Sequence, residues 1–79
     1  MIATRVSDNA SDKLLPGQYA RRGGVWHACT PTGLLANLGG HDVIEHDDGT
    51  ATVQPSILVR DGQGGEWHGY LERGVWREC

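Results

Sequence analysis

The sequence predicts an all-β fold, a small single-domain barrel or sandwich of five to seven short antiparallel strands with an extended N-terminal arm. The chain has 79 residues, which suffices for one domain. Short stretches of alternating apolar and polar residues are separated by Gly, Pro and Asp, and no stretch has a helical period. With 12 glycines and no Phe the core is small, so assembly with a partner would stabilise the chain.

Residues 1–13 are predicted to form the arm, and residues 14–79 the β domain. The sequence MIATRVSDNASDK is polar and has only Met1, Ile2 and Val6 as sizeable apolar residues. Ordering a backbone costs about 1–2 kcal/mol per residue, so these residues cannot order the arm by themselves. We expect the arm to be ordered by contact with the domain or with another chain.

From Gln18 onward the pattern predicts β structure, and in the strand Val25–Thr30 alternation places His27 and Cys29 on one face. The turn-forming residues 31–33 end it. Leu34–Leu38 then predicts another brief strand or an extended link, which the glycines at 39–40 terminate.

A central hairpin is predicted around Asp48–Gly49, because both positions of such a two-residue loop tolerate positive φ. This loop places Ile44 opposite Val53, and both then lie on an apolar face. A slip of one residue would expose that face. Pro55–Ser56 is expected to interrupt the chain before a separate short strand, Ile57–Arg60.

A closing hairpin is predicted to turn at Arg73–Gly74, with Glu72 opposite Val75 and Tyr70 facing Trp76. An aromatic cross-strand pair contributes roughly 0.2–1 kcal/mol to the stability of a sheet relative to alanine. Stabilisation of the hairpin therefore accounts for most of the aromatic residues in this segment. Trp and Tyr are also favoured anchors where a protein partner docks. The predicted partner-binding residues are Trp67, Tyr70, Arg73 and Trp76. One face is predicted to carry Trp67, Leu71, Val75 and Cys79, and the other His68, Tyr70, Trp76 and Glu78.

Zinc is the metal that the sequence suggests, because four residues are of the types that bind it: His27, Cys29, His68 and Cys79. The chain has no C-x-x-C or H-x-x-x-H spacing, and the predicted register sends His68 and Cys79 to opposite faces. We therefore expect no metal or other cofactor, with a zinc site formed by these four residues as the alternative. Whether the two cysteines pair with each other stays open.

Several functional classes are disfavoured by composition. The net charge is −3 and the basic residues are scattered, so nucleic acid is not an expected partner. No apolar run approaches the ~20 residues of a membrane span and no secretory signal is evident, so we expect a cytoplasmic protein. Nothing local activates Ser56 or Cys29 as a nucleophile, and we expect no enzymatic activity.

Two linked segments resemble an uncharacterised family of short phage and prophage proteins, best known from actinobacterial phages. They are DGTATVQPSI at Asp48–Ile57 and WHGYLERGVW at Trp67–Trp76. The resemblance implies a phage origin and a compact β fold, and it supplies no activity. More distant relatives in this resemblance carry a Cys-His pair, which looks like a pair of metal ligands, where Trp67 and His68 stand here.

The leading hypothesis is a virion-associated structural or decoration subunit that acts through contacts with other phage structural proteins or with its own copies. It would reside in the virion and, during infection, in the host cytoplasm. One alternative is an early phage protein that binds and inhibits a host defence factor, and a second is a small zinc-binding protein. Copy number in purified particles distinguishes the first two, and bound metal identifies the third.

Overall fold

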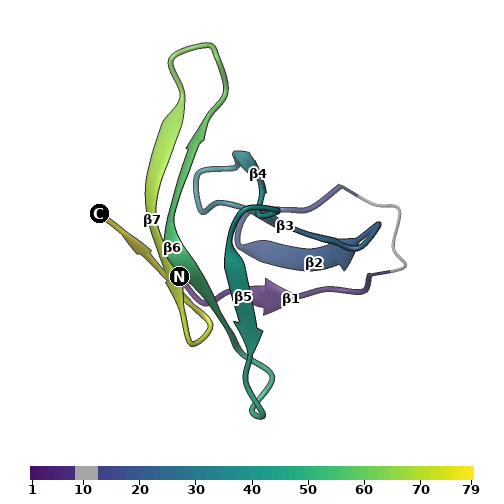
Figure 1. Cartoon of the computed structure of the whole chain (residues 1–79). Helices are drawn as coiled ribbons and strands as arrows, with labels where there is room; N and C mark the ends of the chain where they lie inside the picture. Colours follow the sequence, from purple (N-terminus) through teal and green to yellow (C-terminus); the bar gives the residue numbers. More distant parts are fainter. Residues whose placement is uncertain (9–12) are drawn as a thin grey trace.

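The computed structural model describes residues 1–8 and 13–79, and within them the chain is all-β (Figure 1). The strands are β1 (Thr4–Arg5), β2 (Gln18–Arg22), β3 (Val25–Cys29), β4 (Leu35–Asn37), β5 (Asp42–Glu45), β6 (Ala51–Arg60), β7 (Glu66–Glu72) and β8 (Val75–Glu78). The predicted all-β class is confirmed, but these eight strands exceed the predicted five to seven. The described residues contain no helix long and apolar enough to span a membrane.

The strands form two sheets of four, ordered β1-β2-β3-β4 and β5-β6-β7-β8. Neighbouring strands are antiparallel except β1 and β2, which are parallel, so the predicted purely antiparallel pairing is wrong for that pair. Among the described residues an isolated antiparallel bridge between Ile2 and Val75 links the two sheets, but the strands do not form a closed barrel. Each half of the chain therefore builds one sheet.

The core lies between the sheets, because one buried cluster takes residues from both. Its members are Tyr19, Ala28, Ala36, Leu38, Ala51, Val53, Ile57, Trp67, Leu71 and Trp76. Trp67 and Trp76 pack edge to face with ring centroids 5.5 Å apart. The buried indole Nε1 of Trp76 donates a hydrogen bond to the carbonyl of Gly17, 3.1 Å away, and so connects β8 with the segment leading into β2.

The first six residues of the predicted arm take part in both sheets. The amide of Ala3 donates to the Gly74 carbonyl at 2.8 Å, and the Met1 carbonyl accepts from the amide of Trp76 at 2.9 Å. The amide of Thr4 donates to the Gly17 carbonyl at 3.0 Å, next to the β1–β2 pairing. Residues 9–12 of the predicted arm lie outside the described residues, so the boundary at residue 13 stays a prediction.

Arg5 ties this segment to the second sheet. Its guanidinium lies 2.6 Å from an Asp8 carboxylate oxygen and 3.1 Å from one of Glu45 on β5. It also lies over the Trp26 ring, 4.8 Å from the centroid. The hydrogen bond from Arg5, followed by one from the backbone amide of Arg21, lowers the pKa of Asp8.

This lowered pKa predicts a pH-dependent contribution of Asp8 to stability. Because the folded pKa lies below the unfolded value, the contribution is present above the unfolded pKa and is lost as pH falls through the folded pKa. Urea unfolding of the wild type and Asp8→Asn should therefore differ at about pH 6 and converge at about pH 2. An equal difference at both pH values would contradict the contribution of the charge.

The central hairpin forms, but its predicted register is wrong by one residue. Glu45 pairs with Ala51 and Ile44 with Thr52, so the loop has three residues, 47–49, in place of two. Gly49 has φ of +85°, which suits the left-handed position that ends a three-residue hairpin loop. The shift places Ile44 on the exposed face of the sheet, 46% exposed, and leaves Val43 to pack against the core.

We expect Gly49→Val to lower the free energy of unfolding by about 1–3 kcal/mol, because a β-branched residue is strained at positive φ. The matched control is Gly40→Val. Gly40 is not at positive φ, and no atom lies within 4 Å of an added Cβ there. Chemical denaturation of both variants measures the difference, and equal losses would reject the left-handed loop position as the cause.

Of two further predictions about strands, one is corrected and one is confirmed. Pro55–Ser56 does not separate two strands, because β6 continues through both residues with a register shift between Val53 and Ile57. Proline, which has no amide hydrogen, is tolerated at such irregularities. The predicted brief strand within Leu34–Leu38 is confirmed as β4.

The closing hairpin turns at Arg73–Gly74 as predicted, with both residues at positive φ and Glu72 paired with Val75. The predicted aromatic pair is wrong, since Tyr70 pairs with Arg77, and Leu71 pairs with Trp76. A turn with Glu72 opposite Val75 requires these partners. Consequently Trp76 lies on the core face and Tyr70 on the outer face.

Candidate functional site

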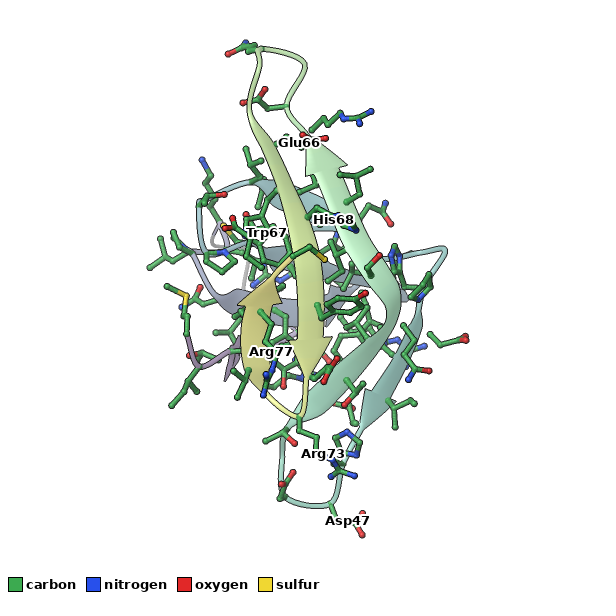
Figure 2. All side chains as sticks on the ribbon, turned by 90° about the vertical axis from the view of Figure 1, so that its left-hand side faces the viewer. Asp47, Glu66, Trp67, His68, Arg73 and Arg77 are labelled. Atoms are coloured by element: carbon green, nitrogen blue, oxygen red, sulfur yellow. The ribbon has the colours of Figure 1, made fainter. Side chains whose placement is uncertain are left out.

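The outer face of the β5–β8 sheet is the candidate site. Burial alternates along β7: Trp67, Gly69 and Leu71 are buried, and the residues between them are exposed. The strand thus presents Tyr70 outward while its neighbours fill the core. Figure 2 views this side of the molecule and labels Arg73 at the β7–β8 turn and Arg77 on β8.

An open groove of about 600 Å³ runs over this face. Its lining includes Ile44, Tyr70, Glu72, Arg73, Val75 and Arg77. Three of these are apolar or aromatic side chains at the surface, with exposed fractions of 46% for Ile44, 41% for Tyr70 and 37% for Val75. Apolar side chains gathered in a concave surface and bordered by charged groups are typical of a site where another molecule binds.

Thr52 organises one end of the groove. Its hydroxyl oxygen accepts a hydrogen bond from the backbone amide of Arg73 at 3.0 Å and lies 2.7 Å from Nε2 of His46. These contacts connect the β5–β6 hairpin to the β7–β8 turn. Because the backbone of Arg73 is fixed by this hydrogen bond, its side chain is positioned beside the groove.

The charged side chains of the groove form no ion pair with any other residue that the structure describes. Among the described residues, the ion pairs join Arg5 to Asp8 and Glu45, and Arg60 to Glu66. None includes Arg73 or Arg77. Both guanidinium groups are therefore available to a ligand in the groove.

The predicted partner-binding residues are divided between the groove and the core. Tyr70 and Arg73 line the groove. Trp67 and Trp76 are 2% and 4% exposed, so neither side chain forms part of the surface. Sequence reasoning missed Ile44 and Arg77, and the correct hairpin registers would have placed both on the outer face with Tyr70.

The predicted zinc ligands lie on two different sheets. The Cys79 sulfur lies 4.0 Å from Nε2 of His68, so the prediction that these two residues face opposite ways is wrong. The same nitrogen lies 3.0 Å from the Ser56 hydroxyl. His27 and Cys29 belong to β3 in the other sheet. Cys29 is buried, and burial raises the pKa of its thiol. The described residues contain no group of three or more potential ligands arranged to hold a metal.

Comparison with known proteins gave no match to a family model, a curated protein or a solved structure. The resemblance to short phage proteins accordingly stays a prediction from the two sequence segments.

Proposed function

We propose that this chain is a non-enzymatic docking protein whose groove on the β5–β8 sheet binds another protein. The observation that carries the proposal is the exposure of Ile44, Tyr70 and Val75 in one concave surface. Aromatic residues in such surfaces often provide much of the binding energy. The two sheets, packed through a shared core as in a small sandwich, supply a rigid support for that surface.

The resemblance to short phage proteins supports a virion as the place where this docking occurs. In this proposal the chain is a structural or decoration subunit that contacts other phage structural proteins or its own copies. It resides in the particle and, during infection, in the host cytoplasm. The modest core of a 79-residue chain supports this role, because binding to a larger assembly stabilises the folded state.

Quantitative mass spectrometry of purified particles tests the proposal. The wild-type chain is expected at a fixed copy number, and Tyr70→Ser and Ile44→Ser should reduce its incorporation by about tenfold or more. Leu35→Ser is the matched control, since Leu35 is 54% exposed but lies on β4 in the other sheet. It should be incorporated normally.

Incorporation is interpretable only for folded variants, so circular dichroism should first show that all three unfold at similar urea concentrations. Normal incorporation of both groove variants would reject the groove as the docking surface. Absence of the wild type from particles, together with a tight complex with a host protein, would instead favour the inhibitor of a host factor.

A further inference from the structure

The groove is positively charged on an acidic protein. Arg73 and Arg77 outweigh Glu72 among its charged lining residues, whereas the whole chain carries a net charge of −3. Opposite charge across an interface directs association and excludes partners of the wrong sign.

We propose that the groove binds an acidic peptide segment of its partner, with an apolar side chain of that segment between two carboxylates. The inference rests on the proposed docking function and names the chemistry of the partner. The apolar side chain contacts Tyr70 and Val75, and the carboxylates pair with Arg73 and Arg77. Arginine suits this role because its planar guanidinium donates two parallel hydrogen bonds to a carboxylate.

The spacing along the β7–β8 hairpin specifies the pattern of the segment. Val75 and Arg77 are alternate residues of the extended strand β8, Arg73 precedes them in the turn, and all three line the groove. Side chains at alternate positions of an extended chain lie about 6.5–7 Å apart. An extended peptide therefore places an apolar side chain and the acidic side chain two positions away at the interval that separates Val75 from Arg77. A second acidic residue, on the other side of the apolar one, extends toward Arg73 at the turn, which gives the pattern acidic-x-apolar-x-acidic.

Tyr70 gives the groove its central contact. It lies on β7 directly opposite Arg77 of β8, so the phenol ring and the guanidinium are cross-strand neighbours. A ligand carboxylate at Arg77 and a ligand apolar group at Tyr70 are then bound side by side. This arrangement distinguishes an acidic-apolar segment from a segment that is acidic alone.

Fluorescence anisotropy with two labelled synthetic peptides tests the inference. In one peptide leucine is flanked at alternate positions by glutamates, and in the other lysine replaces each glutamate. The folded full-length chain should bind the acidic peptide at least about tenfold more tightly, with an affinity that falls as salt is added. Equal affinity for the two peptides, or binding of neither, would overturn the proposal.

Arg77→Glu should abolish the preference for the acidic peptide. Arg60→Glu is the matched control, because it makes the same change in net charge at a residue that pairs with Glu66 and does not line the groove. Loss of the preference in both variants would show a general effect of net charge and would count against the groove as the site.

Particle incorporation separates this inference from the docking function itself. If Tyr70→Ser prevents incorporation but Arg77→Glu does not, docking stands and the acidic partner is wrong. Sedimentation velocity tests whether a second copy of this chain occupies the groove. A wild-type dimer that Arg77→Glu converts to monomer would show that the groove binds another copy of this chain, and this too would overturn the acidic partner segment.

Discussion

Trp76→Ala is expected to lower the free energy of unfolding by about 3–5 kcal/mol, the range for removing a large aromatic side chain from a core. Trp76 is 4% exposed and packs edge to face against Trp67. Its indole also donates the hydrogen bond to Gly17 that connects β8 with the segment before β2. Small domains have a total stability of about 5–15 kcal/mol, so this variant should lose a large part of the stability of the fold.

Urea denaturation followed by circular dichroism measures the loss, and Trp76→Phe separates its two causes. Phenylalanine retains most of the packing but lacks the Nε1 donor, so the buried carbonyl of Gly17 keeps only its hydrogen bond from the Thr4 amide. We expect a smaller loss for this variant, of about 0.5–1.5 kcal/mol for the missing hydrogen bond. Tyr70→Ser, on the outer face, should be the least destabilising of the three. A Trp76→Ala variant as stable as Tyr70→Ser would contradict the core position of Trp76.

The fold class was predictable because its signals are local. Alternating apolar residues and the Arg73–Gly74 turn are visible in the sequence, and the structure confirms both the all-β class and the pairing of Glu72 with Val75. The pairing of β1 with β2 and the contacts of Met1 and Ala3 with the β7–β8 hairpin join residues far apart in the sequence. Two-residue strands with such distant partners leave no periodic pattern.

The errors in hairpin register have a common physical cause. A one-residue change in loop length moves every side chain of a strand to the other face. At Asp48–Gly49 a two-residue and a three-residue loop both place glycine at positive φ, so the residue types alone did not distinguish them. Burial distinguishes them in the structure, since Val43 packs against the core and Ile44 does not.

The candidate site was predicted in part for the same reason. Tyr70 and Arg73 were found from residue type, because aromatic and arginine side chains are common in interfaces. Ile44 and Arg77 required the correct registers, and Trp76 was placed on the wrong face by the incorrect pairing with Tyr70. A useful signal was Gly69, a glycine within a strand two positions after a tryptophan, which often marks a close approach to the backbone.

Gly69→Ala is expected to be the most damaging small substitution in the chain, with a loss of about 1–3 kcal/mol or more from overpacking. Gly69 and Trp67 lie on the core face of β7, and the Trp67 indole covers the glycine. A Cβ added at Gly69 would lie 2.8 Å from Cζ2 of that ring and would also meet the Arg77 carbonyl. Neither neighbour moves easily, because the ring is held against Trp76 and the carbonyl belongs to the paired strand β8.

A double-mutant cycle identifies the contact responsible for this loss. Trp67→Leu removes the ring that covers Gly69, so Gly69→Ala should cost less in the Trp67→Leu background than in the wild type, by about 0.5–3 kcal/mol of coupling. Gly40→Ala is the control for adding a methyl group, because no atom lies within 4 Å of its Cβ position. Its stability should remain within about 1 kcal/mol of the wild type. Additive effects of Gly69→Ala and Trp67→Leu would show that the ring is not the obstacle, and would leave the Arg77 carbonyl as the group that makes glycine necessary at this position.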